Sequence, residues 1–432
     1  MKTTDRRAEG VVILGAGLAG AGAARQLPGA RVFEAAAEPG GYARSHEFAG
    51  AWFDCGTHIC HSRDADWLDL VTERAPLHEM AESRVLNYKA GRWFSYPVQN
   101  HLRDLPEDER RKALEDFLAA QEKYRGRDPR NYEEWCRFQY GDFLLENFYR
   151  LYTAKYWHVP MSEMATDWLG GRLLPSQVET ILAGARGGQT EKQAVFSRFR
   201  YPVEGGFFAL VRHLFDGLPI SFGKKAVEVD AAARIVRFAD GTETAYEELV
   251  STIPLPELVR MAGDVPPSVR EAAGKLRFLK HFCVNFIVER EELSPANWFY
   301  AYDPGIPAAR VSFPFSLSGQ QEGKTAVQAE VFLPGGTRTD GNAILERTLA
   351  DMGRVLDFGP EEIAAAEIRC QPVSYVVSDL ERAAAVRHIR KWLEGRHIRT
   401  AGLFGSWFYI WSDRSYASGV MAARELAECG GS

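Results

Sequence analysis

The stretch VVILGAGLAGAGAARQLPGARVFE, residues 11–34, decides the fold of this chain. Four apolar residues lead into GAGLAG. Gly15 permits a tight strand-to-helix turn, Gly17 lets the backbone approach a pyrophosphate, and Gly20 allows the helix to pack closely on the strand. A small-residue helix follows, and a second strand ends in Glu34, where a carboxylate would accept ribose hydroxyls. This order predicts a dinucleotide-binding unit; the alternative is a glycine-rich turn with no ligand.

The composition is that of an ordinary globular protein. The chain has 432 residues, 46% of them hydrophobic and 25% charged, which suggests two or three domains. A net charge of -6 gives no reason to expect binding to nucleic acid or to an anionic membrane. The six cysteines show neither a CxxC pair nor metal-ligand spacing, so no metal site is predicted. The absence of a long apolar run or a signal-peptide core predicts a cytoplasmic protein.

A second glycine motif follows the strand that bears the acid. Residues 38–45 read EPGGYARS. The chain at Gly41 would run against the pyrophosphate, and Arg44 would supply a counter-charge. The motif resembles the second glycine signature of the flavoproteins that include amine oxidases, protoporphyrinogen oxidase and UDP-galactopyranose mutase, and it favours FAD over NAD. The cofactor site is expected to include Leu18, Ala19, Tyr42 and Ala43 as well.

The rest of the chain changes character in four successive segments. Residues 101–190 show helical periodicity and predict an inserted helical domain. Residues 191–260 return to strand patterns that suit later strands of the nucleotide-binding domain. Residues 261–385 hold β-rich runs between glycine and proline clusters, which predict an antiparallel sheet. Residues 386–432 read as a last strand and a closing helix.

The predicted fold class is therefore α/β, with a Rossmann-type FAD-binding domain, an inserted helical domain and an antiparallel β-sheet substrate domain. Residues 1–100 would form the first part of the FAD domain and share strands with the substrate domain. No second GxGxxG occurs, so a dedicated nicotinamide domain is not expected. The flavin would be reduced by a transiently docked NADPH or NADH, or by the substrate.

Eight further segments resemble UDP-galactopyranose mutases of the eukaryotic type, in the same order over nearly the whole chain. Amine oxidases share the ends of this pattern but not its middle. The segments are FDCGTH (53–58), YPVQN (96–100), KYWHVP (155–160), WLGGR (168–172), FRYP (199–202), LVST (249–252), LER (380–382) and FGSW (404–407).

The resemblance implies an isomerase of carbohydrate biosynthesis that converts the pyranose form of a nucleotide-diphosphate sugar to the furanose form. In that family, reduced FAD attacks the anomeric carbon of the sugar through N5 and expels the nucleotide diphosphate. The resulting flavin–sugar adduct opens and recloses as the five-membered ring. The cofactor carries the covalent step, and the protein holds the diphosphate and the sugar.

Three catalytic positions are implied by the resemblance. Arg172 and Arg310 would bind the diphosphate, since a guanidinium fork matches phosphate oxygens and stabilises charge on a leaving group. His58 would lie on a mobile loop beside the flavin and help to stabilise its reduced, anionic form. Each has an ordinary structural alternative, such as a surface or strand-edge arginine.

Six substrate-binding positions follow from the same resemblance. Tyr96 and Gln99 would lie near the nucleoside, and Trp157 would border the sugar, with core packing as its alternative. A phenol can donate to a phosphate oxygen while its ring packs, which suits a diphosphate and sugar site. The tyrosines expected there are Tyr300, Tyr375 and Tyr409.

The resemblance also implies cofactor contacts in the later part of the chain. Gly419, Val420 and Met421 would begin the final helix and face the N1 and O2 edge of the flavin, where a helix N-terminus favours negative charge. Backbone near Val227 would contact the adenine. The remaining expected cofactor contacts are Gly56, Thr57 and Gly405.

The chain departs from the family pattern in ways that bear on its substrate. Leu317 stands where a diphosphate-binding tyrosine is expected, and Leu403 stands where an arginine near the flavin is expected. Thr57 replaces the second glycine of the histidine loop, and a β-branched residue tolerates positive φ poorly. Losing two polar contacts to a charged partner predicts a substrate other than, or in addition to, UDP-galactose.

Two other classes of function are open on the sequence. A FAD-dependent oxidoreductase of the amine-oxidase type would take hydride from an amine, alcohol or saturated ring and make peroxide from oxygen. A non-catalytic flavoprotein would bind a nucleotide sugar without turnover. The mutase is distinguished by its need for prior reduction of the flavin. The base, the sugar and the oligomeric state are not determined by the sequence.

Overall fold

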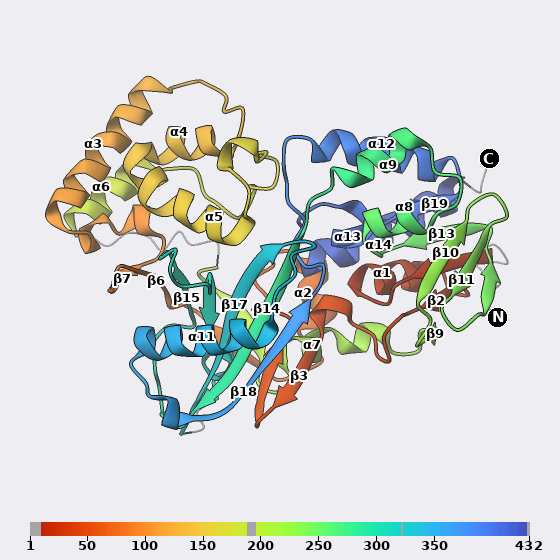
Figure 1. Ribbon diagram of the computed structural model, residues 1–432, viewed down its shortest axis with the longest axis horizontal. Helices are drawn as coiled ribbons and strands as arrows, with labels where there is room; N and C mark the ends of the chain where they lie inside the picture. Colours follow the sequence, from red (N-terminus) through yellow and green to blue (C-terminus); the bar gives the residue numbers. More distant parts are fainter. Residues whose placement is uncertain (1–9, 188–195, 321–322, 430–432) are drawn as a thin grey trace.

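A five-stranded parallel sheet is assembled from segments that lie far apart in the sequence. The computed structural model describes residues 10–187, 196–320 and 323–429, and this sheet lies on the right in Figure 1. Its strand order is β19-β13-β1-β2-β9, and every neighbouring pair is parallel. The strands are β1 (Val11–Leu14), β2 (Arg31–Phe33), β9 (Ile220–Ser221), β13 (Glu248–Ser251) and β19 (Ile398–Thr400).

Helices cover both faces of this sheet, which explains why its central strand β1 is apolar throughout. Val11 and Ile13 belong to the core formed with α1 and α14, whereas Val12 and Leu14 belong to the core formed with α8, α9 and α12. Successive strand residues point to opposite faces, so a strand buried on both sides has no polar position. The helices are α1 (Leu18–Gln26), α8 (Leu255–Met261), α9 (Pro267–Gly274), α12 (Arg382–Glu394) and α14 (Ser412–Cys429).

Helices α1 and α14 approach one another so closely that glycine is required between them. A Cβ atom at Gly419 would lie 1.8 Å from the carbonyl oxygen of Ala19. One at Gly22 would lie 2.3 Å from the carbonyl oxygen of Tyr416. The last helix of the chain is therefore held directly against the helix that follows the first glycine turn.

A seven-stranded sheet, lower in Figure 1, has the order β18-β14-β17-β16-β15-β6-β7. The strands within residues 261–385 pair antiparallel, as the sequence predicted. Strand β6, from the first segment of the chain, joins them by pairing with β15 in parallel, and β7 pairs with β6 antiparallel. A long stretch of chain separates β6 from β15, so no hairpin constrains their direction. Helix α11 (Gly341–Leu356) covers one face of this sheet. The strands are β6 (Val85–Lys89), β7 (Arg92–Ser95), β14 (Leu279–Val288), β15 (Trp298–Ala301), β16 (Arg310–Ser312), β17 (Thr325–Pro334) and β18 (Ile363–Gln371).

A group of helices lies at the upper left in Figure 1, and its helix α5 packs on the seven-stranded sheet, where the ring of Tyr156 lies 4.2 Å from that of Phe332. Its first helix, α3, has three acidic residues in its first turn, which complement the positive end of the helix dipole. Asn131 caps α4 by accepting a hydrogen bond from the backbone of Glu134. The helices are α3 (Glu107–Lys123), α4 (Tyr132–Leu144), the π-helical turn η5 (Leu145–Tyr149), α5 (Arg150–Trp157) and α6 (Val178–Arg186).

Shorter elements connect these regions. None of the helices in the described ranges is long and apolar enough to cross a membrane. The connecting elements are η2 (Gly41–Ala43), β3 (Ser45–Phe48), β4 (Ala51–Asp54), α2 (Ala65–Val71), β5 (Leu77–Met80), β8 (Phe199–Pro202), α7 (Gly206–Val211), β10 (Ala226–Asp230), β11 (Ile235–Phe238), β12 (Glu243–Ala245), α10 (Pro314–Ser318) and α13 (Gly402–Ser406).

The contact between α1 and α14 predicts the effect of one methyl group. We expect Gly419→Ala to lower the free energy of unfolding by about 1 to 3 kcal/mol, because the added Cβ overlaps a backbone oxygen that cannot move away alone. Urea denaturation followed by circular dichroism measures this change. Gly274→Ala is the matched control, since a Cβ atom there meets nothing within 4 Å. Equal destabilisation of both variants would contradict the interpretation.

Candidate functional site

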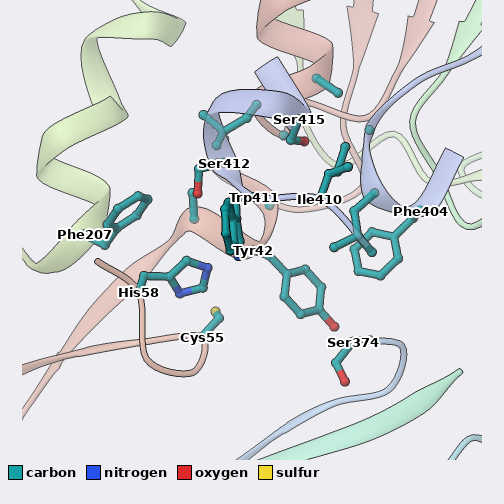
Figure 2. A pocket seen from close by; sticks show the side chains of 18 of the residues that line it. Tyr42, Cys55, His58, Phe207, Ser374, Phe404, Ile410, Trp411, Ser412 and Ser415 are labelled. Carbon is teal, nitrogen blue, oxygen red and sulfur yellow. The ribbon is translucent and has the colours of Figure 1, made fainter. Parts of the chain in front are cut away.

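A cavity of about 620 Å³ lies where the two large sheets and the last part of the chain meet. Both glycine motifs line it, and so do Tyr300, Arg310 and Tyr375 from the second half of the chain. Figure 2 shows the side chains of His58, Trp411 and Tyr42 gathered around its centre. The cavity therefore joins a dinucleotide-type turn to a group of polar and aromatic side chains.

The two glycine motifs form one cradle of bare backbone. A Cβ atom at Gly41, where φ is 55°, would lie 3.3 Å from the Cα atom of Gly17. The two oxygens of Glu34 accept backbone hydrogen bonds from Ala16 at 2.7 Å and Ala36 at 2.8 Å. Each oxygen keeps a further lone pair for a ribose hydroxyl. The cradle and this acid fit an adenine dinucleotide.

Other residues of the predicted cofactor site support the cradle. A Cβ atom at Gly20 would lie 2.0 Å from the carbonyl oxygen of Gly15, so this glycine allows the helix to pack on the turn. Arg44 donates to the carbonyl of Gly41 and pairs with Glu38, and it does not line the cavity. The predicted cofactor residues that line the cavity are Gly15, Gly17, Leu18, Ala19, Glu34, Gly41, Tyr42, Ala43 and Thr57.

The predicted contacts of the final helix need a correction. Helix α14 begins at Ser412, so Gly419 lies inside the helix and not at its N-terminus. Gly419 faces α1, Met421 is 60% exposed, and neither these residues nor Val420 line the cavity. The cavity instead reaches the first turn of α14 at Ser412 and Ser415.

Three further predicted cofactor residues also lie outside the cavity lining. The side chain of Val227 is 45% exposed. A Cβ atom at Gly405 would lie 2.7 Å from the carbonyl oxygen of Ser251, so this glycine packs on β13. A Cβ atom at Gly56, where φ is 87°, would lie 2.6 Å from the ring of His281. Their predicted contacts with the cofactor stay predictions.

Arg310 is held by a fully buried carboxylate. Its Nε and Nη2 atoms donate to the two oxygens of Glu330 at 2.6 and 2.8 Å, and Nε2 of His281 lies 3.1 Å from the same carboxylate. Burial alone would raise the pKa of Glu330, but the charge of Arg310 outweighs it and holds this pKa well below its usual range. The ion pair fixes the guanidinium at the cavity wall.

The loop that carries His58 is tied to the same carboxylate. The hydroxyl of Thr57 donates to Glu330 at 2.7 Å and lies 2.9 Å from the hydroxyl of Ser312, and the backbone N–H of Thr57 donates to Glu330 at 3.2 Å. His58 lines the cavity, and its Nδ1 atom lies 2.8 Å from the carbonyl oxygen of Gly56. Thr57, at the position where the resemblance to the mutases predicted a glycine, thus anchors this loop by its side chain.

The start of the same loop is anchored by Asp54, which is buried at 5% exposure. Its carboxylate accepts hydrogen bonds from the hydroxyls of Ser45 and Tyr201 and from the backbone of Phe207. Burial raises the pKa of this carboxyl. Because the ring of Phe207 packs 5.1 Å from that of His58, the network also positions the histidine.

The second predicted arginine lies behind the cavity wall. The guanidinium of Arg172 stacks on the rings of Tyr409 and Trp411, with its carbon 4.0 and 4.5 Å from the two ring centres. It donates to the carbonyls of Trp168 and Tyr409 and does not line the cavity. In this structure Arg172 supports the aromatic wall, whereas Arg310 faces the cavity.

The predicted substrate residues divide into two groups. Tyr300, Tyr375 and Tyr409 line the cavity. Trp157 is buried at 4% exposure against Tyr375 and Tyr409, so it packs behind them. The residues expected near the nucleoside that do not line the cavity are Tyr96 and Gln99.

Some residues of the site were not singled out by sequence reasoning. Glu330 stands in the apolar run AVQAEVF, and a lone acid inside a buried strand indicates a charge partner. His61 and Trp411 line the cavity without a distinctive pattern around them, and Cys55 lines it from within the FDCGTH segment, where no role was assigned to it. Burial raises the pKa of Cys55 to about 11, so its thiol is protonated at neutral pH. The described residues contain no cluster of His, Cys, Asp and Glu suited to a metal ion.

This parallel sheet and the cradle of backbone at the cavity define a dinucleotide-binding class of protein. The chain belongs to the flavin-containing amine oxidoreductase family, whose sequence profile matches residues 16–427, and the family implies FAD as the cofactor. The fit of the cradle agrees with this assignment.

Solved structures share the fold over nearly the whole chain. Reduced UDP-galactopyranose mutase matches with a TM-score of 0.88 and 24% identity, covering 98% of this chain and 96% of that one. A putative protoporphyrinogen oxidase from Exiguobacterium sp. 255-15 matches at 0.74 and 16%, covering 97% and 98%. A fatty acid isomerase from P. acnes that produces CLA matches at 0.65 and 15%, covering 98% and 99%. The predicted α/β flavoprotein fold is confirmed.

The anchoring of the histidine loop predicts the effect of removing one hydroxyl. We expect Thr57→Val to lower the free energy of unfolding by about 1 to 2 kcal/mol, because Glu330 and Ser312 lose a hydrogen-bond partner while the shape is kept. Thr57→Ser retains the hydroxyl and is expected to lose less than half of that. Urea denaturation of the three proteins measures both changes. Equal stability of the wild type and the valine variant would show that the hydroxyl contributes nothing.

A buried lysine supports the strands that carry Tyr300 and Arg310. The Nζ atom of Lys155 donates to the carbonyls of Ala301 at 2.6 Å and Ala308 at 3.2 Å. Burial lowers the pKa of Lys155 to about 7. The lysine of an unfolded chain titrates near pH 10.4. The unfolded protein therefore binds more protons than the folded protein across the interval between these values.

This difference predicts a pH dependence of stability. Stability rises with pH wherever the unfolded state binds more protons. The contribution of Lys155 to the free energy of unfolding therefore increases as the pH rises from its folded pKa toward its unfolded pKa, and it is lost as the pH falls back through the folded pKa. We expect the free energy of unfolding to rise from about pH 7 to pH 9, and Lys155→Met to flatten that rise. Denaturation curves at several pH values measure it. An unchanged slope in the variant would assign the pH dependence to other groups.

Proposed function

We propose that this protein is a flavin-dependent mutase that converts a nucleotide-diphosphate sugar from its pyranose to its furanose form. One observation carries the proposal: a single cavity joins the dinucleotide cradle to Arg310 and to Tyr300, Tyr375 and Tyr409. A cation and three phenols around one space suit a diphosphate and a sugar. The shared fold with a UDP-galactopyranose mutase supports this reading.

The chain's own residues would bind and position the substrate. Arg310 keeps Nη1 free of its pair with Glu330 and can donate it to a phosphate oxygen of the leaving group. His58 and its loop form part of the cavity wall, with the ring supported by Phe207. Arg172 would act through Tyr409 and Trp411 by fixing their rings. FAD, held in the cradle and reduced by NADPH or NADH, would supply the nucleophile.

Two apolar positions favour a substrate other than, or in addition to, UDP-galactose. Leu317 is 2% exposed and packs in the apolar core with Trp298 and Phe199, so its side chain offers no hydrogen bond and does not line the cavity. Leu403 lines the cavity itself. A diphosphate sugar bound here would have fewer polar partners than the sequence pattern of the family provides.

An oxidoreductase is the second candidate. The family is described as amine oxidoreductases, and one structure with the same fold is a putative protoporphyrinogen oxidase. In that reaction the substrate would transfer hydride to oxidised FAD, and oxygen would be reduced to peroxide.

Turnover by the FAD-loaded protein separates these functions. We expect the dithionite-reduced protein to convert at least one nucleotide sugar of a panel to a faster-hydrolysing furanose isomer, detected by anion-exchange chromatography, and the oxidised protein to convert none. The double variant Arg310→Met with Glu330→Gln removes both members of the ion pair, so neither charge is left buried without its partner. We expect it to lower turnover at least about 100-fold, because the leaving group loses one charged contact. Flavin absorbance checks its folding. Peroxide production from the oxidised wild type, without isomerisation, would favour the oxidoreductase.

A further inference from the structure

Two motifs of the sequence, LER (380–382) and FGSW (404–407), have no part in the proposed reaction, yet the structure brings both to the loop that carries Arg172. The backbone N–H of Ala165 donates to the carbonyl of Ser378 at 2.8 Å, and that of Leu380 donates to the carbonyl of Glu163 at 2.9 Å. These antiparallel hydrogen bonds place the start of α12 beside the loop that leads to Arg172.

Arg382 is the residue at which these segments meet. It is the first residue of α12, and its side chain is 6% exposed. Its Nη2 atom donates to the carboxylate of Asp167, and its Nη1 atom donates to the carbonyl oxygen of Trp407 at 3.0 Å. Its backbone N–H donates to Asp379 at 2.8 Å, which fixes the start of the helix. One buried guanidinium therefore connects the helical region, α12 and the end of α13.

The carbonyl that Arg382 holds belongs to an unusual turn. Trp407 has no exposed surface and a φ of 49°, in the left-handed region. A bulky residue adopts this conformation rarely, and it persists only where the surrounding structure fixes it. The guanidinium carbon of Arg382 also lies 4.8 Å from the centre of the ring of Phe408, the next residue. Arg382 thus holds the turn and the residue that follows it.

The chain that leaves this turn forms one wall of the cavity. Residues 409–413 all line it, and Tyr409 stands only two positions after Trp407. Arg172 donates to the carbonyl of Tyr409 at 2.9 Å, so the segment is held by an arginine at each of two successive turns. Arg382 itself does not line the cavity, and its influence on the site passes through this segment.

We propose that Arg382 is a positioning residue for substrate binding, which fixes the turn at Trp407 and thereby the place of the Tyr409 hydroxyl in the cavity. Asp167 orients the guanidinium and contributes less, because its side chain is 44% exposed. The inference rests on the proposed function, since it assigns to Tyr409 a contact with the nucleotide-diphosphate sugar.

A double-mutant cycle on the FAD-loaded protein tests this role without turnover. UDP, ADP, GDP, CDP and TDP are titrated by calorimetry, and the tightest of them is used in the cycle. We expect Arg382→Met to weaken its binding about tenfold in the wild type. In a Tyr409→Phe background the same change should weaken binding less than about threefold, because the hydroxyl that Arg382 positions is already absent.

Two further variants make the cycle specific. Tyr300 lines the same cavity from β15, so Tyr300→Phe is the matched background, in which Arg382→Met should keep its full tenfold effect. Arg382→Lys retains a charged donor and is expected to weaken binding less than Arg382→Met does. Flavin absorbance and thermal unfolding show whether each variant is folded. If Arg382→Met does not retain FAD, Asp167→Asn takes its place in the cycle, with about a threefold loss expected in the wild type and none with Tyr409→Phe.

The outcomes separate the role of Arg382 from the proposed function. If a nucleoside diphosphate binds the wild type, and Arg382→Met weakens it equally with and without the Tyr409 hydroxyl, the arginine acts on the structure in general and only the positioning proposal falls. That proposal also falls if Arg382→Met changes no affinity. If no nucleoside diphosphate binds the wild type, both proposals fail.

Discussion

The buried carboxylate of Glu330 is the constraint on which the site depends. A carboxylate with no exposed surface is stable only when it is paired and hydrogen-bonded, and here Arg310, His281 and Thr57 supply those partners. The partners come from three separate parts of the chain, so this single charge requires β14, β16, β17 and the histidine loop to meet. The cation at the cavity wall and the loop that carries His58 are therefore positioned by the same group.

The cradle for the dinucleotide depends on close backbone contacts instead. Gly17 meets Gly41, and Gly419 meets the carbonyl of Ala19, so two glycine turns and the last helix come together at the same helix, α1. These contacts leave no space for side chains, which is why the cradle is bare backbone. One side of the cavity is thus formed by closely packed backbone at the glycine motifs. The other side is formed by a buried ion pair and stacked rings.

Local sequence patterns predicted the fold well where the pattern follows directly from the geometry of a turn, a helix or a strand. The run at residues 11–34 predicted strand, turn, helix and acid, because glycine spacing and a short continuous apolar run are properties of adjacent residues. The positions of Tyr300, Tyr375 and Tyr409 at the cavity agree with the resemblance. The same resemblance could not show that Arg172 lies behind Tyr409, or that α14 begins at Ser412, since side-chain direction and loop length are decided by neighbours distant in sequence.

The sequence by itself determined the family of the protein and its flavin-binding architecture. These follow from short-range spacing, which a linear chain records directly. Only the tertiary structure decided which residues share the cavity: Arg310 and His61 line it, whereas Gln99 and Arg172 do not. The reason is that burial and pairing are set by all elements around a group at once. A buried charge and its partners are recognisable only when those elements are assembled.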